Sequence, residues 1–202
     1  MYAEDKYKRS PLLLAAENSH REIIEMLLAN GANIDAANEY GWDAFQYAAR
    51  SGHKEIIEML LAKGANIDAA DKYGGTALQS AAIYGRQEIV EMLLAKGANI
   101  DAADAFGGTA LQYAAGSGDR EIVEMLLAKG VNIDVANEYG WDAFQYAARS
   151  GHKEIVEMLR VKGANIDAAD NYGVTALQDA ERWGEQEIVE TLLAKGAYVH
   201  RR

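Results

Sequence analysis

The chain has 202 residues, half of them apolar and a quarter charged, which is typical of a folded globular protein and not of a disordered one. Its 31 acidic residues outnumber its 20 basic residues and give a formal net charge of −11, which argues against nucleic acid and anionic membranes as partners because both are polyanions. The absence of cysteine excludes disulfides, thiolate metal sites and cysteine nucleophiles.

No segment resembles a targeting or membrane-spanning sequence. Residues 1–7 lack the apolar core of a signal peptide, and no apolar run approaches the roughly 20 residues that cross a bilayer. We therefore expect a cytoplasmic or recombinant soluble protein.

The sequence repeats itself with a period of 33 residues. The segment Gly-Ala-Asn-Ile-Asp-Ala-Ala begins at Gly31, Gly64, Gly97 and Gly163, and a variant of it begins at Gly130. Six blocks of this length cover residues 5–37, 38–70, 71–103, 104–136, 137–169 and 170–202. Because no Pro-, Ser- or Gly-rich linker separates the blocks, residues 1–202 are predicted to form a single domain in which small units stack to bury a shared core.

Each block is predicted to contain two short helices. In blocks two to six the first helix begins at a capping box, in which the side chains of an N-cap residue and of a Gln three residues later bond each other's backbone N–H. The pairs are Asp43/Gln46, Thr76/Gln79, Thr109/Gln112, Asp142/Gln145 and Thr175/Gln178. These helices are expected to end at a left-handed glycine, namely Gly52, Gly85, Gly118, Gly151 and Gly184.

The second helix is predicted over residues 88–96 in the third block. Its apolar residues form a broad stripe opposite two acidic residues, and Lys96 at its end suits the helix dipole. The stripe consists of Ile89, Val90, Met92, Leu93 and Leu94. In the first block, Leu13 and Leu14 are predicted to be exposed, where an end repeat is normally polar.

The 33-residue period, a D-x-x-G turn, a first helix that ends in Ala-Ala before Gly, and the string E-I-V-E-M-L-L-x-x-G-A resemble the ankyrin repeat. The resemblance implies an all-α solenoid of L-shaped helix–turn–helix units, with β-turn fingers, first helices lining a concave groove and second helices behind. It also implies a protein-binding scaffold and not an enzyme. The family's Thr-Pro-Leu-His is Thr-Ala-Leu-Gln or Asp-Ala-Phe-Gln here, so Gln79 and its equivalents are expected to replace in part a His that bonds between repeats.

Positions that differ between these near-identical blocks are not required by the fold and can encode a partner. They occur at the finger tips and along the first helix, and they are rich in Tyr, Trp and Arg, which are enriched at binding hot spots. The predicted partner-binding residues are Glu39, Tyr40, Trp42, Tyr47, Arg50, Tyr73, Ile83, Tyr84, Phe106, Tyr113, Tyr139, Trp141, Tyr146, Arg149, Tyr172, Arg182 and Trp183. Five variable positions are placed on the exposed side of the first helix, namely Tyr47, Ser80, Tyr113, Tyr146 and Asp179. Alternatively, the aromatic residues of the turns pack on neighbouring turns and only stiffen the array.

Blocks two and five are almost copies, so that Trp42, Tyr47 and Arg50 reappear as Trp141, Tyr146 and Arg149. The blocks differ only at Ile57/Val156, Leu61/Arg160 and Ala62/Val161. One hypothesis is a groove with an aromatic–arginine clamp at each end, suited to an elongated or two-fold partner. The alternative is reuse of one module by gene duplication or library assembly.

The sequence gives no indication of catalytic or metal chemistry. His20, His53 and His152 each open a second helix, and they lie a repeat or more apart, whereas helical metal ligands are three or four residues apart. We expect capping or surface roles for them, and no cofactor or metal. The acidic residues that recur on every second helix are interpreted as a solvated face.

We predict a protein-binding scaffold, monomeric, that uses its concave face and binds neither nucleic acid nor membrane. The near-identity of the blocks resembles an engineered repeat binder, and a natural ankyrin array with recent internal duplication is the alternative. Two other functions stay open, a design or stability scaffold without a partner and an assembly that associates weakly end to end.

Overall fold

The computed structural model describes residues 9–197, and its regular structure is almost entirely helical. Twelve helices occur in this part of the chain, two in each repeat. They are α1 (Pro11–Glu17), α2 (Arg21–Ala29), α3 (Ala44–Ser51), α4 (Lys54–Ala62), α5 (Ala77–Ile83), α6 (Gln87–Ala95), α7 (Ala110–Ser117), α8 (Arg120–Ala128), α9 (Ala143–Arg149), α10 (Lys153–Val161), α11 (Ala176–Trp183) and α12 (Gln186–Ala194). The predicted all-α fold of helix–turn–helix repeats is confirmed. Residues 1–7, on which the signal-peptide expectation rests, lie outside the described residues, as do the outer ends of the first and last blocks.

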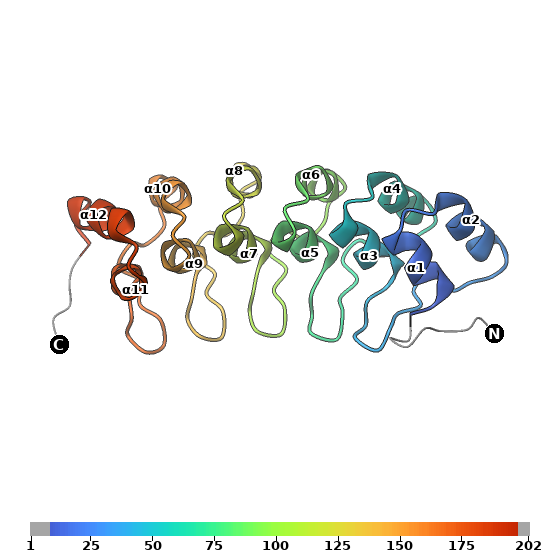
Figure 1. The fold of residues 1–202 in the computed structure, drawn as a ribbon, viewed down its shortest axis with the longest axis horizontal. Coiled ribbons are helices and arrows are strands. Elements are labelled where there is room, and N and C mark those ends of the chain that lie inside the picture. Colours follow the sequence, from blue (N-terminus) through green and yellow to red (C-terminus); the bar gives the residue numbers. More distant parts are fainter. Residues whose placement is uncertain (1–8, 198–202) are drawn as a thin grey trace. The chain divides into compact units, whose positions relative to one another are not determined.

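The backbone packs as two compact units, residues 1–105 with α1–α6 and residues 106–202 with α7–α12. In the first unit α3 packs between α1 and α5, and in the second unit α9 packs between α7 and α11. Each first helix also contacts the second helix of its own repeat. Figure 1 shows that in repeats two to six the first helix lies between the second helix and the long loop that precedes it, which we call the finger. The single domain over residues 1–202 stays a prediction.

The core lies between the two helices of each repeat and between neighbouring first helices. Phe45 and Phe144 are buried near the start of α3 and α9, while Ala48 and Ala49 are small enough to let first helices approach closely. The apolar stripe predicted for residues 88–96 is confirmed, with four of its members buried in α6. These are Ile89, Val90, Met92 and Leu93.

The prediction that Leu13 is exposed is wrong. Its side chain is 1% exposed, because α1 turns Leu12, Leu13, Ala15 and Ala16 inward and packs against α3. Leu14 is half-buried. The apolar residues that the first repeat does expose belong to its second helix, where Ile23 is 42% and Met26 is 57% exposed.

All five predicted capping boxes are present, with both reciprocal bonds formed in each. The five glycines predicted to end the first helices all have positive φ. Gly118 shows why a side chain is not accepted there. Its φ is +79°, and a Cβ atom would lie 2.5 Å from Cε1 of His152.

The capping glutamines also bond the finger that follows them, and Gln46, Gln112 and Gln145 thereby connect neighbouring repeats, as expected for residues that replace the family's histidine. The side-chain amide of Gln46 donates to the carbonyl oxygens of Ala69 (3.2 Å) and Gly75 (2.9 Å) in the next finger. Gln79 donates in the same way to Ala102 at 3.0 Å. Gln112 and Gln145 repeat the arrangement in the second unit. Each of these four glutamines therefore bonds the backbone N–H of its N-cap residue and a carbonyl oxygen of the following finger at the same time.

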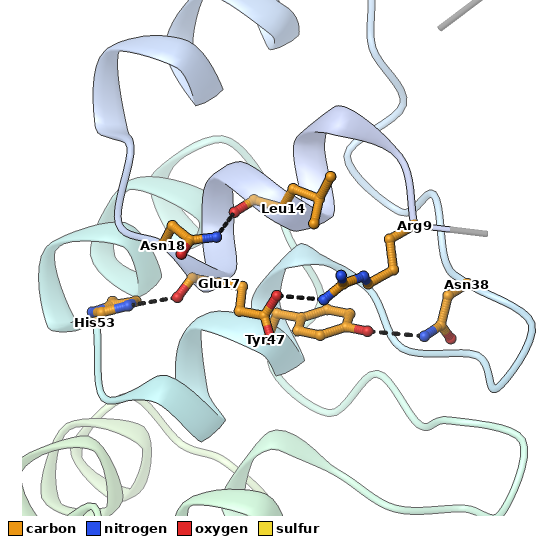
Figure 2. Close-up of polar contacts among 7 residues, drawn as sticks. All are labelled: Arg9, Leu14, Glu17, Asn18, Asn38, Tyr47 and His53. Atoms are coloured by element: carbon orange, nitrogen blue, oxygen red, sulfur yellow. Dashed lines mark hydrogen bonds and ion pairs between the residues drawn. The ribbon is translucent and has the colours of Figure 1, made fainter. Parts of the chain in front are cut away.

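His20 is exposed, as predicted, whereas the rings of His53 and His152 have a role that differs from the capping or surface roles we predict for them. His53 occupies the N-cap position of α4 without a side-chain capping bond, and its Nε2 lies 2.8 Å from the carbonyl oxygen of Glu17 in the preceding repeat. Figure 2 shows this bond beside the end of α1. His152 reaches Gly116 O at 3.1 Å, and Arg86 uses its Nε to reach Arg50 O at 2.9 Å. The sequence pattern does not reveal these contacts because the partners are 36 residues apart.

Candidate functional site

The first unit holds an arginine over two aromatic rings. The Cζ atom of Arg50 lies 5.2 Å from the ring centroid of Trp42 and 4.8 Å from that of Tyr84. The Trp42 ring in turn meets Tyr47 edge-on, with centroids 5.6 Å apart. We call Trp42, Tyr47, Arg50 and Tyr84 the first aromatic–arginine cluster. Contacts of a cation with ring faces are favourable and reduce the freedom of the side chain.

The fingers hold this cluster in place through hydrogen bonds. Trp42 Nε1 donates to Asp71 Oδ2 at 2.8 Å, and the other oxygen of Asp71 accepts from the backbone N–H of Tyr73 and Gly75. Asn38 orders the finger before α3 by accepting from two backbone N–H groups with Oδ1. Its Nδ2 donates to the Tyr47 hydroxyl at 3.0 Å, as Figure 2 shows.

The second unit repeats the arrangement with one substitution. Arg149 lies over Trp141 at 4.5 Å and over Trp183 at 5.0 Å, so that a tryptophan stands where the first unit has Tyr84. Trp141 and Tyr146 meet edge-on, with centroids 5.7 Å apart. We call Trp141, Tyr146, Arg149 and Trp183 the second aromatic–arginine cluster.

Asp170 anchors the second cluster as Asp71 anchors the first. Trp141 Nε1 donates to its Oδ2 at 2.9 Å. Burial acts to raise the pKa of Asp170, but the bonds from Trp141 and from the backbone N–H of Val174 and Tyr172 prevail and hold that pKa below its ordinary value. The carboxylate is therefore kept ionised by the ring that it holds.

A pocket of about 400 Å³ opens beside the first cluster. Aromatic side chains form much of its wall, and charged residues of the first and third repeats stand at its edge. The lining includes Tyr40, Trp42, Tyr47, Arg50, Tyr73 and Asp71. On the side of the first repeat, Arg9 donates to Glu17 at 2.6 Å, and Figure 2 shows the pair facing Tyr47.

The two clusters differ in the residues around the arginine. The positions of Ser80 and Ile83 in the first unit correspond, 99 residues later, to Asp179 and Arg182 in the second. Asp179 is only 3% exposed, and its Oδ2 has no hydrogen-bond partner among the described residues. Burial raises the pKa of Asp179, and the positive charges of Arg149 and Arg182 oppose that rise without cancelling it.

The structure exposes most of the predicted partner-binding residues but not Tyr47. That side chain is 6% exposed, so its predicted place on the exposed side of the first helix is wrong, because it packs beneath Trp42 and bonds Asn38. Asp179 is likewise buried, while the remaining three, Ser80, Tyr113 and Tyr146, are half-buried. The exposed members of the predicted set are Glu39, Tyr40, Tyr73, Ile83, Tyr84, Phe106, Tyr139, Tyr172, Arg182 and Trp183.

The structure brings eight of the predicted residues into the two clusters, four in each unit. A clamp that uses both clusters at once stays a prediction. Sequence reasoning missed the residues that hold the rings, Asn38, Asp71 and their equivalents. One signal was available for Asn38, because Asn replaces Asp at the start of a block only in the two blocks that carry Trp in the finger.

The described residues also bear on metal binding and on membrane insertion. Within residues 9–197, no group of three or more His, Asp and Glu side chains is arranged to hold a metal ion. None of the helices described there is long and apolar enough to cross a membrane.

The sequence was compared with protein families and with curated proteins. The family model described as ankyrin repeats in three copies matches residues 1–71, 65–137 and 111–202, which together span the chain. No curated protein matches this sequence. Ankyrin repeats are generally protein-interaction modules and are typically not enzymes. The match agrees with the 33-residue period of the sequence and with the paired helices and intervening fingers of the structure. The chain therefore belongs to the ankyrin repeat family.

Proposed function

We propose that the protein is a binding scaffold that recognises a protein partner with its fingers and first helices, the surface expected to form the concave groove. The observation that carries the proposal is the pair of aromatic–arginine clusters on that surface. Each places an arginine over a partly exposed tryptophan or tyrosine. Trp, Tyr and Arg are enriched at binding hot spots, and Trp and Tyr bury a large area with few rotatable bonds.

The exposed finger tyrosines support the same conclusion. Tyr40 and Tyr73 are 49% and 53% exposed, and both line the pocket of the first unit. Trp42 and Trp141 do stabilise the fingers, as the alternative interpretation expects, because their indole N–H groups bond the next finger. The tyrosines retain large apolar surfaces in water, and a partner that covered them would gain the free energy of burying those surfaces.

The near-identity of residues 38–70 and 137–169 supports an engineered origin for the scaffold, with recent duplication of a natural array as the alternative. A second function, weak self-association, is favoured by one observation, the exposed Ile23 and Met26 on α2. Sedimentation of the I23K/M26K variant beside the original chain tests it. A concentration-dependent rise in mass that persists in the variant contradicts self-association through α2.

Selection of binders from a random-peptide display library, with the full chain as bait, tests the main proposal. Each selected peptide is then measured against the Y40A/Y73A variant and against a matched variant, E58A/E91A, whose substitutions lie on exposed second-helix positions. We expect the finger variant to lose about tenfold or more in affinity, as hot-spot removal does, and the second-helix variant to retain it. Failure to select any binder, or peptides sensitive only to E58A/E91A, overturns the proposal.

A further inference from the structure

Arg50 presents hydrogen-bond donors that no group in the described chain uses. Its Cζ atom lies over the ring of Trp42 at 5.2 Å and over that of Tyr84 at 4.8 Å. A guanidinium carries five N–H donors, and these ring contacts supply no oxygen or nitrogen acceptor for them. Within residues 9–197 the Arg50 side chain has no ion pair and no hydrogen-bond acceptor.

The two carboxylates nearest to the pocket are already engaged. Glu17 accepts from Arg9 at 2.6 Å. Asp71 accepts from Trp42 Nε1 and from the backbone N–H of Tyr73 and Gly75. The pocket therefore contains four charged side chains, three with polar partners and one, Arg50, with aromatic contacts only.

We propose that this pocket binds a peptide segment whose Asp or Glu side chain pairs with the edge of Arg50 while an aromatic side chain enters the pocket. The proposal rests on the proposed function, because it names the chemistry of the partner that the scaffold recognises. A carboxylate matches the guanidinium edge in charge and in geometry, with two parallel N–H···O bonds. The contacts with the two rings have already restricted the arginine, which lowers the entropic cost of forming those bonds.

The volume and the walls of the pocket suit the second part of the ligand. About 400 Å³ lies within the range of small-ligand pockets, and Tyr40, Trp42 and Tyr73 offer ring surfaces to a further aromatic side chain. In an extended peptide the side chains of residues i and i+2 point the same way. We therefore expect the aromatic and acidic residues of the ligand to be separated by one residue.

The second cluster provides a control within the same chain. Asp179 occupies the position that Ser80 has in the first unit, and its charge acts on both Arg149 and Arg182. An incoming carboxylate would meet this negative charge, whereas the first cluster has a serine hydroxyl there. Carboxylate binding is therefore assigned to Arg50 and not to Arg149.

The experiment uses the full chain with W141F and W183F, so that Trp42 is its single tryptophan. Fluorescence of Trp42 is followed during titration with the capped peptide Ac-Phe-Gly-Glu-NH₂ and with the matched peptide Ac-Phe-Gly-Gln-NH₂. We expect the acidic peptide to bind about tenfold tighter, the factor that a charge-assisted bond supplies. A third peptide, Ac-Phe-Gly-Gln-OH, carries its only carboxylate at the C-terminus and is expected to bind no better than its amide.

Two variants assign the preference to the proposed contact. R50K keeps the positive charge but lacks the planar fork, and it is expected to lose most of the preference for the acidic peptide. S80D introduces the acid that the second unit already accommodates at this position, and it is expected to weaken the acidic peptide about tenfold while leaving the Gln peptide unchanged. Heteronuclear NMR spectra of both variants check that their folds are retained.

Equal affinities for the Glu and Gln peptides, or a preference that survives R50K, overturn the inference. Tighter binding of the free C-terminal carboxylate overturns the assignment to an acidic side chain. Failure of this inference is distinguishable from failure of the proposed function. Display-selected peptides that depend on Tyr40 and Tyr73 but tolerate R50K leave the scaffold function intact and refute only the role of Arg50.

Discussion

Trp42 and Asp71 are 29 residues apart, yet the indole N–H of one donates to the carboxylate of the other at 2.8 Å. Because Asp71 also orders its own finger, this bond connects two consecutive fingers. The D71N variant keeps one carbonyl oxygen for the finger, as Asn38 does in the preceding repeat, but loses the acceptor for Trp42. We expect its free energy of unfolding in urea to fall by about 1 kcal/mol.

A double-mutant cycle with W42F isolates that contact. If this bond accounts for the lost stability, adding D71N to the W42F variant lowers the free energy of unfolding little further. The coupling free energy between the two substitutions is then about 1 kcal/mol. Additive effects of D71N and W42F contradict a direct role for this bond in stability. D170N with W141F is the matched pair in the second unit.

The buried carboxyl group of Asp179 is expected to make stability depend on pH. Burial raises its folded-state pKa above the ordinary value of 3.8, so the ionised group costs stability at neutral pH. That cost is relieved as pH falls through the raised pKa toward 3.8. D179N removes the charge and should stabilise the protein at pH 7 by about 1 kcal/mol, the order of an unpaired buried polar group. The gain should shrink near pH 4.

Urea unfolding of D179N and of the original chain at both pH values measures this effect. A variant that is less stable at pH 7, or a gain that grows on acidification, would show that the attraction of Arg149 and Arg182 outweighs burial. S80D is the converse change, and it should destabilise the first unit at pH 7 more than at pH 4.

The side-chain amide of Gln79 serves both its own cap and the next finger. Q79A removes one bond of the capping box, from the Thr76 N–H to Gln79 Oε1, and leaves the carbonyl of Ala102 without this donor. The other bond survives because the backbone N–H of residue 79 donates it. We expect a loss of about 2 kcal/mol in unfolding free energy, combining the lost bond with buried groups left unsatisfied. E58A on the exposed surface of α4 should change stability by less than about 0.5 kcal/mol. A similar small loss in Q79A would argue against a stabilising role for the bond from Gln79 to the next finger.

Two glycines of the second unit allow the free-energy cost of backbone strain to be measured apart from the cost of steric contact. Gly118 and Gly184 have φ values of +79° and +77°, but a Cβ at Gly118 would meet the His152 ring at 2.5 Å, whereas none of the described atoms lies within 4 Å at Gly184. G184A should cost about 1 kcal/mol for the left-handed conformation alone, and G118A should cost more. Thermal unfolding of both variants, with H152A added to G118A, checks the difference. The two costs should become similar once the imidazole is removed.

The local pattern was enough to predict the helices, their caps and their ends. Thr76 with Gln79, and the glycine at Gly85, act over a few residues, so that their spacing in the sequence determines their role. The repeat period also indicated which positions would share a surface, and Trp42 and Arg50 do meet there.

Contacts between repeats could not be read in the same way. Tyr47 was expected to be exposed because its position varies between blocks, but variation does not report burial beneath a neighbouring ring. Leu13 and Asp179 were misplaced for a related reason, since the packing of the adjacent helix decides whether they meet water. The Glu17 carbonyl that His53 reaches has no sequence signature at all, because every residue carries a backbone oxygen.

The bonds from the capping glutamines to the fingers all run in one direction. Gln46 and Gln79 in the first unit, and Gln112 and Gln145 in the second, donate from a first helix to a carbonyl of the finger that follows it. Repeats two to five thus present a side-chain donor toward the C-terminus, and the following finger presents a backbone acceptor. A block of 33 residues can therefore be duplicated or excised in register, because the glutamine of one repeat then meets the same kind of carbonyl in the next finger.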